Sequence, residues 1–232
     1  MYTTRELYKA HTESLEDDVD FYFDFCQEKQ TLELFAGFGR ITNKLIAKGC
    51  DIETVELDPF MAVFIDLPEH KNHIGDVREF TSGKRFDRIF AAYNSFPLLT
   101  DDEDIRQFFS SMSELLDVGG KLALNVYHPN WWENAVDYPL TIGDGTVRYS
   151  SGYNLERRYT DKIAQWHDHY DLPDGDRQTI SHTIRLYENS ADFTPYLEGI
   201  ELGHINTVIN YNRPEHELVE PGWVDFIFQK QG

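Results

Sequence analysis

Apolar residues follow two different spacings along the chain. In the first thirty residues they recur at helical intervals, with Leu7 and Val19 among them, which predicts two amphipathic helices that cover the rest of the fold. From Thr31 onward, short apolar runs alternate with helical stretches. The runs are TLELFAG, DIETVEL, HIGD, FDRIFAAY and KLALNVYH, and the helical stretches include residues 40–47 and 59–65. Strands that alternate with helices predict an α/β fold with a parallel sheet.

The last helix of this alternation lies in TDDEDIRQFFSSMSELLDVGG. Thr100 is its expected N-cap, with Glu103 at the capping-box position, and Gly119 and Gly120 are expected to end it. Each strand-helix-strand connection should be right-handed, which leaves the carboxyl ends of the strands at one edge of the sheet. Open α/β sheets bind ligands at that edge, so we expect the site there.

The pattern changes after Asn130 to polar and bulky residues in alternation, in TVRYSSGYN, KIAQWHDHYDL and TISHTIRLYE. A turn at residues 173–176 separates two of these runs, which predicts an antiparallel sheet. A short helix at residues 194–197 follows, and then strands at HINTVINY and GWVDFIF. The expected organisation is a helical cover (1–30), an α/β core (31–130 and 183–232) and an antiparallel lid (131–182).

The chain is acidic, with 41 Asp and Glu against 21 Lys and Arg and a net charge of -20. Such a field repels polyphosphates and anionic membranes, so nucleic acid and membranes are not expected partners. No stretch reaches the roughly 18 apolar residues of a membrane span, and no leader is evident, which favours the cytoplasm. Cys26 and Cys50 form no CxxC pair, so neither a disulfide scaffold nor a cysteine-built zinc site is expected.

The candidate chemistry begins where the first strand turns into a helix, at Gly37 and Gly39. Glycines there let backbone amides approach a ligand, although they also serve a simple tight turn. Glu33 lies inside the apolar first strand, where a carboxylate is costly unless a ligand uses it. Glu56 ends the second strand, at the spacing from Gly37 that suits ribose hydroxyls, and Asp76 follows the third strand. Three acids at three strand ends predict a nucleoside cradle.

Two nucleoside cofactors fit that cradle, NAD and S-adenosylmethionine. A pyrophosphate favours a third glycine and no nearby carboxylate, whereas this chain has Thr42 at the third position and Glu33 close by. The cationic amino-acid end of S-adenosylmethionine tolerates Glu33 well. The acids therefore favour the sulfonium cofactor.

Five segments then identify a known pattern: TLELFAGFGR, ETVELDPFM, GDVREF, FDRIFAAYNSFPLL and LLDVGGKLALNV. In this order they resemble the successive motifs of class I S-adenosylmethionine-dependent methyltransferases, over roughly residues 31–127. The resemblance implies a Rossmann-like class I methyltransferase sheet with an antiparallel β insertion forming a lid. It also implies S-adenosyl-L-methionine as cofactor and S-adenosyl-L-homocysteine as product.

The same resemblance assigns the cofactor-binding residues. Glu33, Gly37 and Gly39 would border the methionine moiety, Glu56 would bind the ribose hydroxyls, and the adenine would lie against the residues after the second and third strands. The full set is Glu33, Phe35, Gly37, Gly39, Arg40, Glu56, Leu57, Asp58, Met61, Asp76, Val77 and Tyr93. One departure is Phe35, which stands where the family usually begins its glycine triplet.

The segment after the fourth strand reads Tyr93-Asn94-Ser95-Phe96-Pro97. It lacks the signature of adenine methyltransferases and the cysteine of cytosine C5 enzymes. The layout of the late insertion is similar to the small-molecule branch that includes sugar-amine and glycine N-methyltransferases. This similarity implies a small-molecule acceptor. The acidic, aromatic lid and the absence of an unambiguous base favour methylation at nitrogen over oxygen.

The acceptor side draws its candidates from the strand ends, the first helix and the insertion. The catalytic candidates are His128, Tyr93, Asn94 and His167, and the substrate-binding candidates are Tyr8, Tyr127, Trp132, Trp166 and His169. His128 is either a base or substrate anchor, or a histidine hydrogen-bonded in the turn before Pro129. His167 and His169 share one face of a strand, as metal ligands can, and His182 could pair with them across the sheet. No third ligand is fixed by the sequence, and no metal is expected.

The acidic runs 16–18 and 101–104 are expected to be solvated helix starts without a functional role. The protein is expected to act as a monomer or homodimer. Three other functions remain open: an O-methyltransferase with His128 or His167 as base, a noncatalytic cofactor-binding module, and a nicotinamide oxidoreductase.

Overall fold

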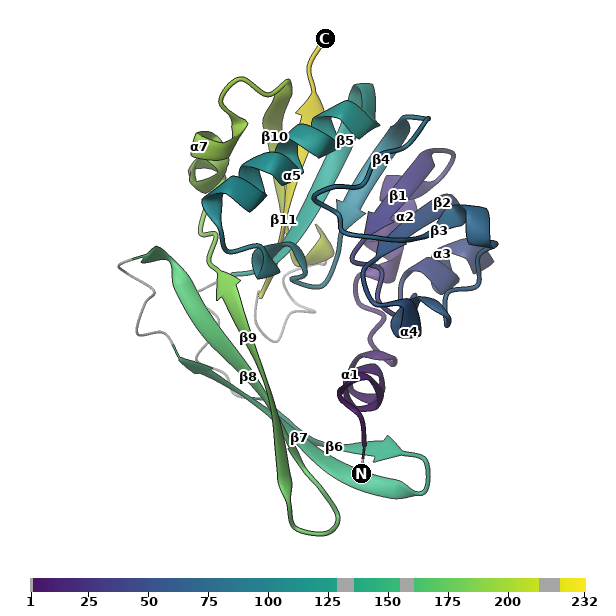
Figure 1. The fold of residues 1–232 in the computed structure, drawn as a ribbon, viewed down its shortest axis with the longest axis vertical. Coiled ribbons are helices and arrows are strands. Elements are labelled where there is room, and N and C mark those ends of the chain that lie inside the picture. The colour runs from purple at the N-terminus through teal and green to yellow at the C-terminus, as the bar shows by residue number, and fades with distance from the viewer. Residues whose placement is uncertain (1, 129–135, 155–160, 213–221) are drawn as a thin grey trace.

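The computed structural model describes residues 2–128, 136–154, 161–212 and 222–232. Its larger sheet has seven strands in the order β10-β11-β5-β4-β1-β2-β3 (Figure 1). The strands are β1 (Gln30–Leu34), β2 (Asp51–Glu56), β3 (Asn72–Ile74), β4 (Phe86–Ala91), β5 (Leu116–Tyr127), β10 (Leu202–Ile209) and β11 (Trp223–Lys230). The first five pair in parallel, and β11 lies antiparallel between β5 and β10.

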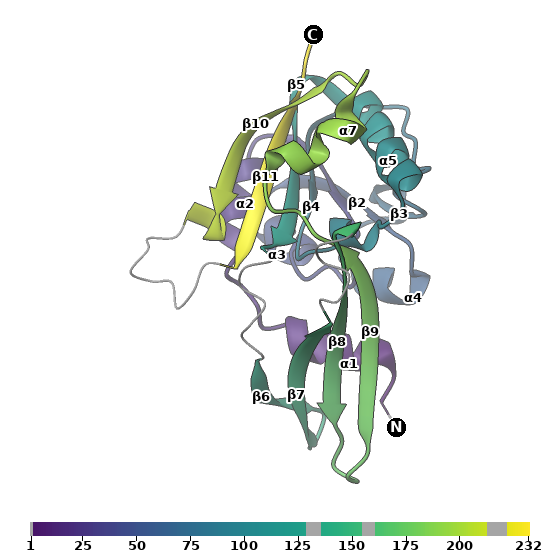
Figure 2. The ribbon, with the colours of Figure 1, turned by 90° about the vertical axis from the view of Figure 1, so that its left-hand side faces the viewer.

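Helices cover both faces of this sheet (Figures 1 and 2). One face packs against α5 (Asp102–Leu115) and α7 (Thr194–Leu197), and the other packs against α2 (Val19–Cys26) and α3 (Thr42–Ala47). The alternation along β5 produces this division, because Leu122 and Leu124 belong to the core under α5 while Ala123 belongs to the core under α2. The short elements are α4 (Pro59–Ala62) and 3-10 turns at Glu69–Lys71, Phe96–Leu98, Ser190–Phe193 and Asn210–Asn212.

A second sheet contains β6 (Asp137–Ile142), β7 (Gly145–Asn154), β8 (Ile163–Asp171) and β9 (Arg177–Arg185). Its strands are antiparallel in sequence order, and Figure 1 shows it apart from the helices that cover the large sheet. The turn predicted at residues 173–176 joins β8 to β9, with Gly175 at φ +92°. The predicted fold class, a Rossmann-like sheet with an antiparallel insertion, is confirmed.

The first helix, α1 (Thr4–Thr12), packs on the second sheet. Its Leu7 is fully buried in a cluster with Leu140, Val147, Tyr149 and Tyr170. A capping box between Thr3 and Glu6 fixes its start. The two helices predicted in the first thirty residues are therefore present, but each contacts a different sheet.

The expected ends of α5 were wrong. Asp101 is the N-cap instead of Thr100, because the Asp101 carboxylate accepts hydrogen bonds from the N–H groups of Glu103 at 2.8 Å and Asp104 at 3.4 Å. The helix ends at Leu115, and Gly119 and Gly120 lie within β5 instead of closing the helix. The helix expected at residues 40–47 begins at Thr42.

Both cysteines are free thiols, with Cys26 buried and Cys50 half-buried. Within the residues that the structure describes, no helix combines the length and apolar character needed to cross a membrane.

Gly120 provides a test of the packing of β5. A Cβ atom at Gly120 would lie 2.8 Å from the carbonyl oxygen of Asp117 and 3.1 Å from that of Phe86, and both are backbone atoms that cannot rotate away. We expect Gly120→Ala to lower the free energy of unfolding by about 1–3 kcal/mol. Gly83→Ala is the control, because a Cβ there meets nothing within 4 Å. Thermal unfolding of the two variants measures the difference, and equal melting temperatures would contradict the packing described.

Candidate functional site

The turn from β1 into α3 holds three residues in the left-handed backbone region: Phe35 at φ +54°, Gly37 at +58° and Gly39 at +78°. A non-glycine residue there is strained, and Phe35 compensates by packing against the main core. A Cβ on Gly37 would meet nothing within 4 Å, so the loop faces open space at this point. A Cβ on Gly39 would lie 3.0 Å from Ile65, so this glycine serves packing.

Glu56 ties this loop to the end of β2. Its two carboxylate oxygens accept hydrogen bonds from the N–H groups of Gly37 at 2.7 Å and Asp58 at 2.8 Å. Each carboxylate oxygen has a second lone pair, so the group can still accept bonds from ligand hydroxyls. The structure therefore holds the predicted ribose-binding acid beside the glycine loop.

Glu33 is a carboxyl group buried at the carboxyl end of β1. It is 3% exposed, and the Thr42 hydroxyl donates to it at 2.6 Å. Burial raises the pKa of Glu33 to about 8, although the hydrogen bond from Thr42 and the charge of Arg40 act in the opposite direction. A cationic ligand group beside Glu33 would favour its ionised form.

A small pocket of about 30 Å³, here called the glycine-loop pocket, lies over this turn. Its lining comes from three parts of the chain, namely α1, the β1–α3 turn and the end of β4. It consists of Tyr8, Glu33, Phe35, Ala36, Gly37, Phe38, Arg40, Ile41, Ala92, Tyr93 and Ser95. Six of the predicted site residues are thus brought together, since Tyr8, Glu33, Phe35, Gly37, Arg40 and Tyr93 all belong to this lining.

The other predicted cofactor residues lie along the ends of β2 and β3, outside this lining. Leu57 is 67% exposed, while Met61 and Val77 are buried. The Asp58 carboxylate caps α4 and pairs with Arg5 of α1 at 2.5 Å. The Asp76 carboxylate pairs with Arg78, whose hydrogen bonds lower the pKa of Asp76. The cofactor contacts of these residues remain predictions.

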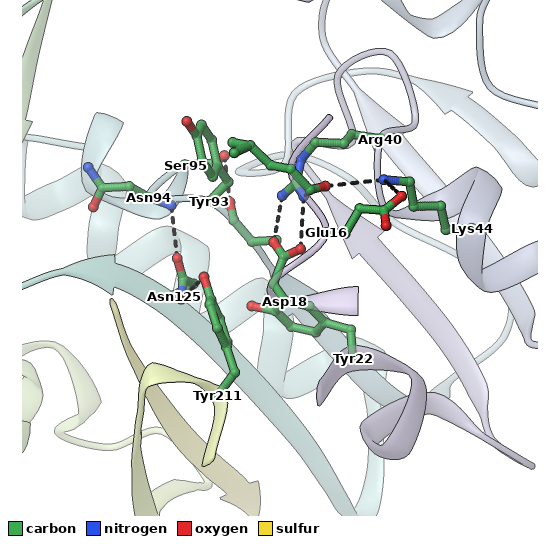
Figure 3. Close-up of polar contacts among 12 residues, drawn as sticks. Glu16, Asp18, Tyr22, Arg40, Lys44, Tyr93, Asn94, Ser95, Asn125 and Tyr211 are labelled. Atoms are coloured by element: carbon green, nitrogen blue, oxygen red, sulfur yellow. Dashed lines mark hydrogen bonds and ion pairs between the residues drawn. The ribbon is translucent and has the colours of Figure 1, made fainter. Parts of the chain in front are cut away.

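Arg40 makes a buried ion pair that the sequence did not reveal. Its guanidinium donates to the two carboxylate oxygens of Asp18 at 2.8 and 2.5 Å, as Figure 3 shows. Burial disfavours the charged guanidinium, but the hydrogen bonds and charge of Asp18 outweigh it and raise the pKa of Arg40. The expectation that Asp18 is a solvated helix start was wrong, because its side chain is only 4% exposed. Asp18 and Arg40 lie 22 positions apart in the chain, so no local sequence pattern indicates that they pair.

Tyr93 and Asn94 follow β4 with successive positive φ angles of 52° and 54°. Asn125 of β5 accepts a hydrogen bond from the Asn94 N–H at 3.2 Å, and the Asn94 side chain accepts one from the Tyr127 N–H at 2.9 Å (Figure 3 shows the first). These bonds hold the strained turn. The Tyr93 ring lies against the Arg40 guanidinium, 5.1 Å away, and its hydroxyl contacts His11 at 3.2 Å.

Two larger cavities of about 260 Å³ each lie between the two sheets and α1. The Asp168 cavity is lined by Tyr8, His11, Tyr93, Asn94, Ser95, Leu98, Trp166, Asp168, His182 and Ile184. The Arg40 cavity is lined by His11, Leu15, Asp17, Asp18, Arg40, Tyr93, Tyr127, Val136, Tyr138, Tyr149, Ser151, Trp166, Tyr211 and Trp223. Tyr93 belongs to both linings and to the glycine-loop pocket, so it stands where the three spaces meet.

His11 is a lining residue of both cavities that sequence reasoning missed. It stacks on Tyr149 with ring centroids 4.2 Å apart and hydrogen-bonds the hydroxyl of Tyr170 at 3.0 Å. Burial lowers the pKa of His11 to about 4, so the imidazole is neutral near pH 7. Its partners lie 82 and 159 positions away in the chain, and no local pattern marks that contact.

The predicted acceptor residues divide into two groups. Tyr8, Tyr93, Asn94, Tyr127 and Trp166 line at least one of the cavities. His128 is half-buried after β5, where its N–H donates to the carbonyl of Gly222, and it lines neither cavity. Trp132 lies outside the described residues.

His167 and His169 do share one face of β8, with ring centroids 6.0 Å apart, but that face points away from the cavities. His167 contacts the Ser181 hydroxyl and His169 the Thr179 hydroxyl. The expected pairing of His182 with them was wrong, because His182 lies opposite Trp166 and therefore on the other face. In the described part of the chain, no group of three or more His, Cys, Asp or Glu residues could hold a metal ion.

Part of the sequence resembles a known protein, although no protein-family model matches the chain. A curated relative, the dTDP-3-amino-3,4,6-trideoxy-alpha-D-glucopyranose N,N-dimethyltransferase of Streptomyces venezuelae, is 32% identical over 81 residues, which span 35% of this chain but only 30% of the relative.

Solved structures resemble the chain over nearly its whole length. The sugar N-methyltransferase KedS8 from Streptoalloteichus sp ATCC 53650 gives a TM-score of 0.76 at 16% identity, over 100% of this chain and 94% of that one. The S-adenosylmethionine-bound CalS10, an amino pentose methyltransferase from Micromonospora echinaspora, gives a TM-score of 0.72 at 17% identity, over 100% of this chain and 98% of that one. The chain therefore has the fold of S-adenosylmethionine-dependent methyltransferases.

The buried Glu33 predicts a specific pH dependence of stability. Its folded-state pKa of about 8 lies above the unfolded value, so its favourable contribution is complete below about pH 4.5 and is lost as the pH rises through 8. Glu33→Gln removes the charge and keeps an oxygen to accept from Thr42. We expect the melting temperature of this variant to exceed that of the wild type by at least about 3 °C at pH 9 and by much less at pH 5. Glu114→Gln, an exposed position on α5, is the control, and a pH-independent difference for Glu33→Gln would contradict the buried charge.

Proposed function

We propose that this protein transfers a methyl group from S-adenosylmethionine to an amine nitrogen of a small molecule. The observation that carries the proposal is the position of Tyr93, which lines the glycine-loop pocket, the Asp168 cavity and the Arg40 cavity. A cofactor bound over the glycine loop would thus lie next to a space that can hold an acceptor. The relative and the structural neighbours named above are N-methyltransferases or amino-sugar methyltransferases, which supports the same reaction.

The residues of the glycine loop suit the proposed cofactor. S-adenosylmethionine supplies a methyl group bonded to a positively charged sulfur. Glu33 would pair with the amino group of the methionine end, because a buried carboxyl with a raised pKa gains from a nearby cation. Glu56 would accept the ribose hydroxyls, and the open space above Gly37 leaves room for the ligand against the backbone.

The acceptor side would work by alignment and exclusion of water. Tyrosine and tryptophan rings from α1, β4 and the second sheet enclose the cavities, and the Arg40 charge is neutralised by Asp18. Such walls hold a small molecule in one orientation, which is the main requirement for an in-line displacement. A neutral amine needs no strong base, whereas a hydroxyl does. His128 and His167, the two bases considered for an O-methyltransferase, lie outside both linings.

Transfer of a labelled methyl group tests the activity directly. The first acceptor to try is dTDP-3-amino-3,4,6-trideoxy-alpha-D-glucopyranose, the compound in the name of the relative, followed by a set of small amines and their hydroxyl counterparts. Label on amines supports the proposal. Label only on hydroxyls would indicate an O-methyltransferase, no label despite tight cofactor binding would indicate a binding module, and binding of NAD instead would indicate an oxidoreductase.

A cytoplasmic location, a monomeric or homodimeric state and the domain limits given above remain predictions.

Glu56 provides the test of cofactor binding. Glu56→Ala removes the acceptor for ribose hydroxyls and the bonds to Gly37 and Asp58, so we expect the affinity for S-adenosylhomocysteine to fall at least about tenfold, the equivalent of one charged hydrogen bond. Titration calorimetry measures this. Glu69→Ala, an exposed position in the turn before β3, should bind as the wild type does. An unchanged affinity of Glu56→Ala would remove the ribose assignment.

A further inference from the structure

We propose that Asp168 and His182 of the second sheet recognise the acceptor nitrogen as an ammonium ion, and that His182 removes its proton. This inference rests on the proposed function and assigns the substrate class, a small amine that is protonated at neutral pH. Neither residue was an acceptor-side candidate in the sequence, where His182 was considered only as a partner of His167 and His169. Both line the Asp168 cavity, which shares Tyr8, Tyr93 and Ser95 with the glycine-loop pocket.

The hydrogen bonds of Asp168 leave one of its oxygens available. Oδ1 accepts from the Tyr149 hydroxyl at 2.8 Å and from the Trp166 indole N–H at 2.9 Å. Oδ2 has the His182 Nε2 atom at 3.7 Å, which is an ion-pair distance and too long for a hydrogen bond. The residue is 5% exposed, so its charge has lost most of its water. A buried carboxylate with spare acceptor capacity binds a cation that donates hydrogen bonds.

The rest of the cavity lining suits a positive charge. The rings of Tyr8, Tyr93 and Trp166 can contact a cation through their faces, and Leu98 and Ile184 complete an apolar wall. Within the described part of the chain, this lining holds no Lys or Arg, and Asp168 is its one carboxylate. An anionic group would therefore meet an unfavourable field at this position, while an ammonium ion would neutralise Asp168.

His182 connects this position with solvent. It lies opposite Trp166 in the β8–β9 register, and its side chain is 41% exposed. In the proposed step, the N–H bond of the ammonium breaks, the His182 Nε2 atom takes the proton, and the electron pair stays on the amine nitrogen. The imidazolium then returns the proton to water. The other titratable groups near Asp168 are His11, whose pKa burial lowers to about 4, and five tyrosines whose pKa values burial raises, so all of them stay neutral near pH 7. The tyrosines are Tyr8, Tyr93, Tyr138, Tyr149 and Tyr170.

Binding of a matched pair of probes tests the ammonium site without requiring turnover. Benzylamine is charged at pH 7, and benzyl alcohol has nearly the same shape without the charge. Calorimetry on the wild type, with and without S-adenosylhomocysteine, should show benzylamine binding at least about tenfold tighter, as one charged hydrogen bond predicts. Asp168→Asn keeps the shape and loses the charge, so it should remove this preference while changing the alcohol affinity less than about twofold. Asp174→Asn, in the exposed β8–β9 turn, should leave both affinities unchanged.

Two results would overturn the inference: no preference for the amine in the wild type, or equal losses for both probes in Asp168→Asn. Because Tyr149 and Trp166 depend on Asp168, that variant could fold poorly, so a wild-type crystal soaked with benzylamine provides a second measurement. The amine nitrogen should lie within hydrogen-bond distance of Asp168 Oδ2, and a nitrogen placed elsewhere contradicts the assignment. Failure of S-adenosylhomocysteine to bind would instead count against the proposed function, so the two failures are distinguishable.

Discussion

The parallel pairing of β1 with β2 and β4 is the constraint on which the site depends. Parallel strands bring their carboxyl ends to one edge, and their register places Glu33 opposite Thr54 and Phe90, one residue before the turn to the glycine loop. Glu56 then reaches the amide of Gly37 at 2.7 Å. Because the strands fix the backbone, the sheet sets the positions of Glu33 and Glu56. The second sheet and α1 add the opposite wall of the same space.

The buried ionisable side chains near this edge of the sheet are of two kinds, those in a matched ion pair and those without one. The Arg40 guanidinium is fully matched by the Asp18 carboxylate, so the pair is electrically neutral and joins the start of α2 to the turn before α3. Among the described residues, Glu33 makes no ion pair, and Asp168 has only the His182 Nε2 atom at 3.7 Å. Both carboxyl groups accept hydrogen bonds from hydroxyl or indole donors instead. A paired charge contributes to structure, whereas an unmatched one costs free energy that a ligand of opposite charge can recover.

The sequence predicted the fold better than the site. Strand-helix alternation and the later polar-bulky alternation depend on neighbouring residues, so both sheets were predicted, as was the turn at residues 173–176. The positions of the glycine loop, Glu33 and Glu56 at strand ends were also predicted, because strand ends can be read locally. His11, Asp18 and Asp168 were missed, because their roles come from partners far away in the chain or from the cavity they face. The N-cap of α5 was misplaced by one residue, because Thr100 and Asp101 are adjacent polar side chains that compete for the same amides. The end of α5 was placed too late, because Gly119 and Gly120 belong to β5.

Phe35 shows how a backbone shape can persist without the residue type that usually provides it. The turn needs a left-handed residue at this point, and Phe35 adopts φ +54° because its ring is anchored in the core below. A motif that requires glycine at this position would reject this chain, although Phe35 adopts the left-handed backbone conformation that glycine favours. Loops of this kind are therefore better recognised by the dihedral angles they require than by their amino acids.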